Sequence, residues 1–149
     1  MSLKIIHTAD WHLGQTFFGY DRDEEHEAFL SWLIDILTLR QTDVLLIAGD
    51  VFDVANPSAA AQRRFFRFLR EANRRNPQLQ IVIIAGNHDS AARLEAPIPL
   101  LEELNTSIVG AVPRTDLCKI DFDSLLIPLY NKEGKREAIC LAVPYLRQG

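Results

Sequence analysis

The sequence predicts an α/β fold in which parallel βαβ units come first and short antiparallel strands follow. Three apolar runs, at 4–8, 44–48 and 81–85, are rich in Val and Ile, which is typical of buried parallel strands. Longer segments with helical periodicity separate them, as expected of strand–helix–strand units. Each run leads directly into a polar motif, and open α/β sheets bind ligands just beyond the carboxyl ends of their strands. We therefore expect one edge of the sheet to carry the chemistry.

The first helix is expected from about residue 23 to residue 40. Apolar side chains recur there at i, i+3, i+4, i+7 and i+8, and they define one face for packing on the sheet: Phe29, Trp32, Leu33, Ile36 and Leu37. His26 is expected on the polar side of this helix, in contact with solvent. His7, within the first strand, is expected to be a core histidine.

The second helix is expected from Asn56 to Asn73, with Asn56 as its N-cap and Pro57 as its first residue. Arginines occupy much of its surface, and we expect most of them to face solvent. The predicted inward stripe consists of Ala61, Phe65, Phe68, Leu69 and Ala72.

Shorter elements are expected in the last third of the chain. A short helix is predicted from Pro97 to Asn105, and strands are predicted at 107–109, 117–122, 125–129 and 138–143. Residues 131–134 are expected to form the turn of a hairpin. The closing residues 144–149 carry no stop signal, so we expect the fold to continue beyond them.

Length and composition fit one domain, since 149 residues with 48% hydrophobic side chains supply a single core. The net charge of −4 does not by itself indicate nucleic-acid binding. Mild acidity is nevertheless compatible with a phosphate substrate, because bound divalent ions would offset the charge of nearby carboxylates. The sequence shows no signal peptide and no apolar stretch of membrane-spanning length, so a cytoplasmic protein without a membrane partner is expected.

Three motifs follow the three predicted strands: Asp10-Trp11-His12, Gly49-Asp50-Val51-Phe52-Asp53 and Gly86-Asn87-His88-Asp89. Carboxylate, imidazole and amide groups together form an oxygen-rich site that suits divalent metal ions. The candidate metal ligands are Asp10, His12, Asp50 and Asn87. Asp10 and His12 are two residues apart, so in an extended segment they would point the same way. The simpler alternative is turn chemistry, because Asp and Asn favour loops at strand ends.

Phosphodiester hydrolysis is the reaction that this set of residues favours. Two divalent ions about 3.5–4 Å apart clamp the attacking and the leaving oxygens of such a reaction. Asp50, beside the flexible Gly49, is the expected bridge between two ions. His88 is expected to act as a general acid or oxyanion donor rather than as a ligand. Asp53 is expected to accept a hydrogen bond from His88 and to fix its tautomer.

The order Asp-x-His, Gly-Asp-x-x-Asp, Gly-Asn-His-Asp resembles the calcineurin-like metallophosphoesterase superfamily. The residues at 7–14, 48–53 and 85–90, and the closing Val143-Pro144-Tyr145-Leu146-Arg147, look most like its DNA-repair nucleases. This resemblance implies a double-strand exonuclease and single-strand endonuclease, with two divalent metal ions, foremost Mn²⁺. It also implies a role in DNA repair and recombination, with DNA and a long-coiled-coil ATPase as partners.

One departure from the superfamily pattern concerns histidines. The superfamily completes its site with a further His and a Gly-His-x-His motif, whereas no histidine of this chain lies beyond His88. The resemblance therefore implies that residues 1–149 are the N-terminal part of a nuclease domain. The C-terminal half with its metal ligands, and the DNA-binding cap domain, would then be absent from this sequence.

Two other functions stay open from the sequence. One is a phosphoesterase for a small molecule such as a cyclic nucleotide or a nucleotide. The other is a catalytically inert, dimerising fragment. For the nuclease as well, a homodimer is expected through the helices from Asn56 to Asn73 and from Pro97 to Asn105. Apolar residues on these helices lie off the faces expected to pack on the sheet: Phe66, Leu100 and Leu104. A loop with Phe17, Phe18 and Tyr20 is expected either to pack against the fold or a partner, or to stack on DNA ends.

Overall fold

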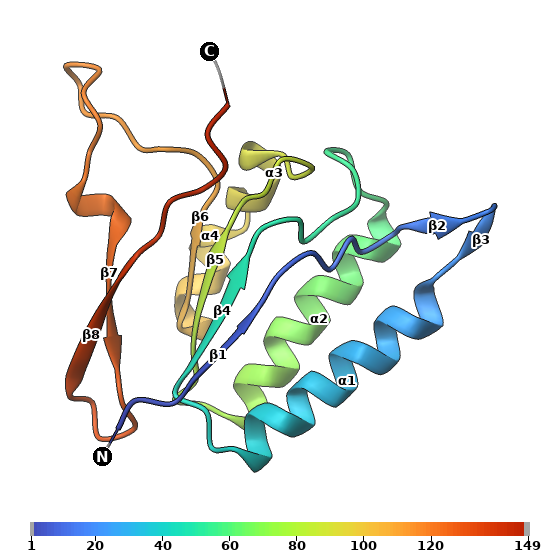
Figure 1. Ribbon diagram of the computed structural model, residues 1–149, viewed down its shortest axis with the longest axis horizontal. Coiled ribbons are helices and arrows are strands. Elements are labelled where there is room, and N and C mark those ends of the chain that lie inside the picture. The colour runs from blue at the N-terminus through green and yellow to red at the C-terminus, as the bar shows by residue number, and fades with distance from the viewer. Residues whose placement is uncertain (1, 148–149) are drawn as a thin grey trace.

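A four-stranded parallel sheet organises the computed structural model, which describes residues 2–147 (Figure 1). The strand order is β1-β4-β5-β6, with β1 at Ile5–Thr8, β4 at Val44–Ala48, β5 at Gln80–Ile84 and β6 at Thr106–Val109. All three neighbouring pairs are parallel. The carboxyl ends of the strands therefore meet at one edge of the sheet, and the predicted α/β class is confirmed.

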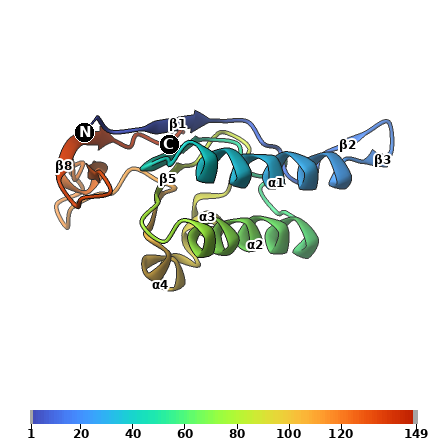
Figure 2. The ribbon, with the colours of Figure 1, turned by 90° about the horizontal axis from the view of Figure 1, so that it is seen from below.

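Two long helices cover one face of this sheet. α1 spans Asp23–Leu39 and α2 spans Ala59–Arg75, and they lie side by side in both ribbon views (Figures 1 and 2). Alternate residues of β4 serve the two faces, as the pleat requires: Leu45 and Ile47 belong to the core under the helices, whereas Val44 belongs to a second core on the opposite face. The buried stripe of α2 is the predicted one: Ala61, Phe65, Phe68, Leu69 and Ala72.

An antiparallel hairpin covers part of the other face of the sheet. β7 (Leu126–Tyr130) pairs with β8 (Arg136–Leu141), and residues 131–134 form the predicted turn. Leu125, Leu129 and Ala142 pack there against Val44 and Val82. The Gln80 side chain donates a hydrogen bond to the Pro128 carbonyl at 2.8 Å, which ties the hairpin to the sheet.

Several boundaries differ from the sequence prediction. The N-cap of α2 is Ser58 rather than Asn56, because the Ser58 hydroxyl accepts the Ala61 N–H at 3.1 Å. The segment after β5 forms α3 (Ala91–Glu95), which was not predicted, then α4 (Ile98–Leu101) and the 3₁₀ turn η1 (Glu102–Leu104). Residues 117–122 form no strand but a loop with one bridge between Arg114 and Ile120, and the 3₁₀ turn η2 (Asp123–Leu125) follows.

The predicted apolar face of α1 is only partly correct, since Leu33 and Leu37 are buried as expected but other positions differ. Trp32 is 55% exposed, whereas His26 is only 7% exposed and is buried with Leu30, Leu33, Ile34 and Leu37. α1 packs against both α2 and the sheet, so its apolar face is turned from the stripe that the periodicity suggested. The prediction for His7 was wrong as well: it is exposed, because β1 is an edge strand of the described sheet.

A small hairpin projects beyond the start of α1 (Figures 1 and 2). Its strands are β2 (Thr16–Phe17) and β3 (Tyr20–Asp21), and three of its side chains are 64%, 85% and 79% exposed: Phe17, Phe18 and Tyr20. Packing of this loop against the rest of the fold is therefore not observed, and contact with a partner or with DNA remains a prediction. No helix within residues 2–147 is both long and apolar enough to span a bilayer.

Candidate metal centre

The loops that follow β1 and β4 stay hydrogen-bonded to each other beyond the ends of their strands. Asp10 N–H donates to the Gly49 carbonyl at 3.1 Å, and His12 N–H donates to the Asp50 carbonyl at 3.0 Å. Three of these residues have left-handed backbone conformations, with φ of 56° at Asp10, 49° at His12 and 49° at Asp50. The sequence predicted an extended segment from Asp10 to His12. The structure contradicts this prediction, because both residues have left-handed backbone conformations. Backbone of this kind costs free energy and is concentrated at functional sites.

Trp11 fixes the first of these loops to the helices. Its ring meets three phenylalanine rings edge to face, with centroids 5.1 to 6.3 Å away: Phe29, Phe65 and Phe68. Its indole N–H donates to the Thr8 hydroxyl at 2.9 Å. With Trp11 buried under the helices, Asp10 and His12 are left at the edge of the sheet. The alternation of polar and apolar residues from Asp10 to Leu13 was the sequence signal for this anchor.

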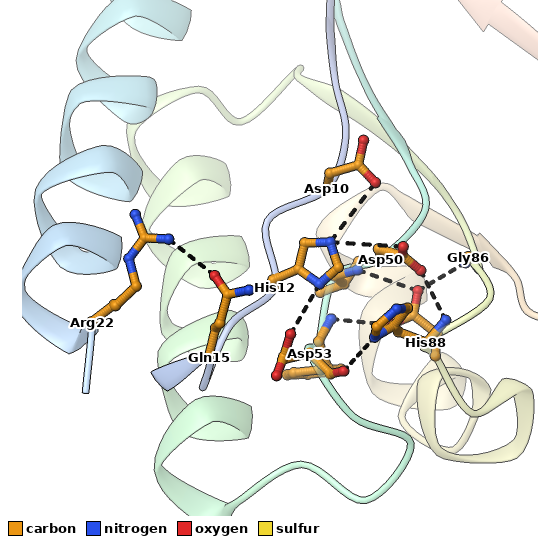
Figure 3. Close-up of polar contacts among 11 residues, drawn as sticks. Asp10, His12, Gln15, Arg22, Asp50, Asp53, Gly86 and His88 are labelled. Carbon is orange, nitrogen blue, oxygen red and sulfur yellow. Dashed lines mark hydrogen bonds and ion pairs between the residues drawn. The ribbon is translucent and has the colours of Figure 1, made fainter. Parts of the chain in front are cut away.

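His12 faces two carboxylates (Figure 3). Its Nε2 lies 4.0 Å from Asp10 Oδ1 and 3.8 Å from Asp50 Oδ2. Ligand atoms held about 2.1 Å from one ion are about 3 Å apart at right angles and about 4 Å apart on opposite sides. These three side chains thus have the donor types and the spacing for a single divalent cation, and they form one of two candidate metal-binding groups in the described residues.

The other nitrogen of His12 is engaged by Asp53. His12 Nδ1 lies 3.2 Å from Asp53 Oδ1, so Nδ1–H donates to this carboxylate and Nε2 keeps its lone pair. A histidine oriented in this way by a carboxylate is typical of metal ligands. The sequence prediction had paired the Asp53 carboxylate with His88 instead. The structure corrects this, because the loop after β4 turns the Asp53 side chain toward the loop after β1.

His88 contacts Asp53 through a different atom. His88 Nδ1 lies 2.6 Å from the main-chain carbonyl oxygen of Asp53, and its ring is perpendicular to that of His12 with centroids 5.0 Å apart (Figure 3). The hydrogen bond to this carbonyl raises the pKa of His88 above its ordinary value, and the carboxylates of Asp50, Asp53 and Asp89 add to the effect. His12, Asp53 and His88 form the second candidate group. The Nε2 atom of His88 is the nitrogen that remains for a substrate.

Asp50 connects the second motif with the third. Its Oδ2 faces His12, while its Oδ1 accepts the backbone N–H of His88 at 2.9 Å. Gly86 makes this approach possible, because a Cβ at that position would overlap the Asp50 carboxylate. The close packing of a glycine against the central carboxylate explains why the third motif begins with Gly86.

The buried Asp89 carboxylate links the second and third motifs by hydrogen bonds to their backbones. Its side chain is 1% exposed, and its carboxylate accepts backbone N–H groups from Val51 at 3.2 Å, Phe52 at 3.0 Å and Gly86 at 2.9 Å. Sequence reasoning assigned no role to this residue. The available sequence signal was an acidic residue at the end of the third motif. The burial of its carboxylate between two loops is visible only in the tertiary structure.

Asn87 is exposed, next to His88. Its backbone carbonyl accepts a hydrogen bond from Arg147 at 3.0 Å. The structure records no side-chain contact of Asn87 with Asp10, His12 or Asp50 in the described residues, so its role as a ligand remains a prediction.

The chain belongs to the calcineurin-like phosphoesterase family, whose model matches residues 3–137. Family membership implies divalent metal ions, for which the two His and Asp groups are candidates. The fold and the arrangement of motifs at the sheet edge are consistent with this family.

Within the family, the chain is homologous to SbcD, one of the subunits of the bacterial nuclease SbcCD. It is 50% identical over 146 residues to the SbcD protein of Rhodobacter capsulatus, a match that covers 98% of this chain and 36% of that protein. Identity to the SbcD protein of Escherichia coli K12 is 34% over 145 residues, or 97% of this chain and 33% of the relative. Identity to the Bacillus subtilis SbcD protein is 40% over 122 residues, or 82% and 31%. The chain thus spans about a third of the length of the relatives it matches.

Proposed function

We propose that the protein is a metal-dependent DNA phosphodiesterase of the SbcD type, with exonuclease activity on double strands and endonuclease activity on single strands. The observation that carries this proposal is the convergence of His12 Nε2 with the Asp10 and Asp50 carboxylates, at 4.0 and 3.8 Å, beside His88. The similarity to the SbcD proteins of the nuclease SbcCD supports DNA as the substrate.

Each side chain has a distinct part in the proposed reaction. Asp10, His12, Asp50 and Asn87 would hold two divalent ions, Mn²⁺ foremost, as part of a larger ligand set to which residues outside 1–149 contribute. Such ions supply charge neutralisation on the phosphoryl oxygens and an activated water. Asp50 would be the ligand shared by the two ions, since it lies between the first and third motifs, with Oδ2 toward His12 and Oδ1 toward His88 N–H. His88 donates a hydrogen bond from Nε2 to the phosphoryl or leaving oxygen.

The proposed partners are DNA, an SbcC-like ATPase and a second copy of this chain. The relatives are named as one component of a nuclease called SbcCD, which supports an SbcC-like partner. An apolar groove between α2 and the α4–η1 segment supports dimerisation, because Leu100 is 75% exposed there beside Phe66 and Leu104. Exposed apolar surface of this kind marks interaction sites.

A nuclease assay tests the proposal. The 149-residue chain and the full-length protein are incubated with labelled single- and double-stranded DNA, and with a cyclic nucleotide, in the presence of Mn²⁺ or EDTA. We expect Mn²⁺-dependent cleavage of DNA by the full-length protein, its loss in Asp50→Asn, and its retention in Asp116→Asn. Asp116 is a matched control because it is exposed, lies in the 111–122 loop and makes no side-chain hydrogen bond or ion pair in the part of the chain that the structure describes.

The same assay separates the alternatives. Cleavage of the cyclic nucleotide without cleavage of DNA would favour a small-molecule phosphoesterase. Activity of the full-length protein together with an inactive 149-residue chain would identify the isolated chain as a catalytically inert part of the enzyme. A full-length protein that cleaves neither substrate overturns the proposal.

A further inference from the structure

Outside the three motifs, the segment 142–147 is hydrogen-bonded to the loop that carries Asn87 and His88. After β8 the chain passes back over the carboxyl end of β5 (Figure 1), where Tyr145 N–H donates to the Ala85 carbonyl at 2.9 Å. Ala85 directly precedes the third motif. The segment 142–147 therefore lies against the base of that loop, although it is about 60 residues away in sequence.

Arg147 extends this contact to the tip of the loop. Its Nη2 donates to the Asn87 carbonyl at 3.0 Å and to the Asp89 carbonyl at 2.9 Å. These carbonyls belong to the residues on either side of His88: the Asn87 carbonyl is part of the peptide group that joins Asn87 to His88, and the Asp89 carbonyl is part of the peptide group that follows Asp89. The Arg147 Cζ atom also lies 6.0 Å from the centre of the Tyr145 ring, at the outer limit of a cation–π contact.

The loop is held from its other side by the motifs themselves. The buried Asp89 carboxylate binds Gly86 N–H, and Asp50 Oδ1 binds His88 N–H. These contacts fix amide groups and leave the carbonyls of Asn87 and Asp89 to Arg147. A charged donor makes hydrogen bonds roughly twice as strong as a neutral one. The peptide group between Asn87 and His88 is thus held at both ends, its carbonyl by Arg147 and its N–H by Asp50.

We infer that Arg147 is a positioning residue for the reaction: it holds the Asn87–His88 loop so that His88 meets the phosphoryl group in a productive orientation. This inference rests on the proposed function, in which His88 is the donor. Anchoring of the segment 142–147 alone is a weaker explanation, because Tyr145 N–H already ties that segment to Ala85. Displacement of a reacting group by about 1 Å costs up to about 10²-fold in rate, so a loop restraint has a measurable kinetic effect.

The test compares Arg147→Met, Arg147→Lys and Arg136→Met in the full-length protein. Arg136 is the matched control, since it is exposed on β8 and its side chain makes no hydrogen bond or ion pair within residues 2–147. We expect Arg147→Met to lower kcat for DNA cleavage by about 10–100-fold with KM changed less than about twofold. Lys can still donate to both carbonyls and should restore most of kcat, and Arg136→Met should leave the rate unchanged.

A double mutant identifies the residue through which Arg147 acts. In a His88→Ala background, Arg147→Met should change kcat less than about twofold, because the positioned group is gone. A loss as large in that background as in the wild type, or a rise in KM without a fall in kcat, would overturn the inference. A purely structural role for Arg147 predicts the first of these outcomes, an equal loss of kcat in the two backgrounds.

Hydrogen–deuterium exchange gives a readout that is independent of activity. In the protein without metal or DNA, Arg147→Met should speed exchange at the amides of residues 86–89, while those of β4 stay protected. Unchanged exchange at 86–89 overturns the inference. A wild-type protein that cleaves no DNA, together with faster exchange in Arg147→Met, would refute the proposed function while supporting the restraint itself.

Discussion

Asp53 distinguishes the two histidines of the site by the atom it offers to each. Its carboxylate binds Nδ1 of His12, and its main-chain carbonyl binds Nδ1 of His88. His12 then presents a lone pair toward Asp10 and Asp50, which suits a metal ligand. His88 is exposed and its pKa is raised, first by the Asp53 carbonyl, so it keeps a proton to a higher pH than an ordinary histidine. Such a group suits proton donation.

Substitutions at these two positions should therefore have different effects. Asp53→Asn removes the carboxylate that orients His12 but keeps the carbonyl that binds His88, so Mn²⁺ affinity should fall about 10–100-fold. His88→Ala should lower the cleavage rate by roughly 10²–10⁴-fold while Mn²⁺ affinity stays near normal. Calorimetric titration with Mn²⁺ and a cleavage assay measure the two quantities. Loss of Mn²⁺ binding in His88→Ala would show that His88 is itself a ligand.

His26 makes the stability of the fold depend on pH. It is buried on α1, its Nδ1 has no hydrogen-bond partner in the described residues, and its pKa is lowered from 6.5 by burial and then by Arg22 and Arg64. The unfolded chain takes up this proton near pH 6.5, whereas the folded chain resists it. The free energy of unfolding should thus fall as pH drops from about 6.5 to the lowered pKa of the folded state.

Replacement of His26 by Leu checks this prediction. The apolar side chain keeps the packing of α1 but cannot titrate, so the loss of stability between pH 7.5 and pH 5.5 should become smaller. Urea denaturation at the two pH values measures the difference. An equal loss in the wild type and in His26→Leu would assign the pH dependence to other groups.

At the scale of elements, the sequence predicted best where one face alone is buried. The stripe of α2 is correct because its apolar residues, apart from Phe66, gather on one face and arginines occupy much of the rest. α1 carries apolar residues on more than one face, so more than one stripe satisfied its periodicity and Trp32 was placed inward in error. The alternating apolar residues of the 117–122 segment predicted a strand. The segment lies outside the sheets and forms only one isolated bridge, so it has no neighbouring strand with which to pair.

The site was predicted in its location but not in its contacts. Strand ends placed the three motifs at one edge, because parallel strands share that edge. The left-handed backbone at Asp10, His12 and Asp50, and the roles of Asp89 and Arg147, depend on how loops distant in sequence pack together. No local pattern reports such contacts.

The Asp89 carboxylate tests how much the loop packing contributes to stability. Asp89→Asn keeps the shape but replaces one oxygen by an N–H₂ group that faces backbone donors. Loss of buried, charge-assisted hydrogen bonds should lower the free energy of unfolding by roughly 1–3 kcal/mol. Denaturant titration measures this change, with Asp116→Asn as the control that should have no effect. Equal stability of the two variants would show that the Asp89 contacts are not stabilising.

At the scale of the whole molecule, charge is arranged differently on the two sides of α2. Toward α1 its arginines form ion pairs, as Arg64 does with Asp23 and Glu27 and as Arg75 does with Asp35. Arg63 and Arg70 lie beside the apolar groove, and no ion pair is recorded for them within residues 2–147. The exposed Glu102 and Glu103 lie on η1, whose Leu104 lines the same groove. A second copy related by a two-fold axis would bring basic α2 against acidic η1 twice.

Leu100 is the side chain that best tests this dimer. Phe66 and Leu104, which the sequence placed away from the core, are half-buried and pack partly against it, so a charge there would also disturb the fold. Leu100 is 75% exposed in the groove, and Leu100→Glu should separate the copies without unfolding either one. Leu117, 78% exposed in the 111–122 loop, supplies the control Leu117→Glu.

Sedimentation velocity over a range of concentrations measures the outcome. The wild type and Leu117→Glu should sediment as dimers and Leu100→Glu as a monomer, while circular dichroism shows the same fold in all three. If Leu100→Glu stays dimeric, the groove is not the interface, because a buried pair of carboxylates near the two-fold axis would not be tolerated there. If the wild type is monomeric at every concentration, the apolar groove does not hold two copies of this chain together, and the proposed dimer is wrong.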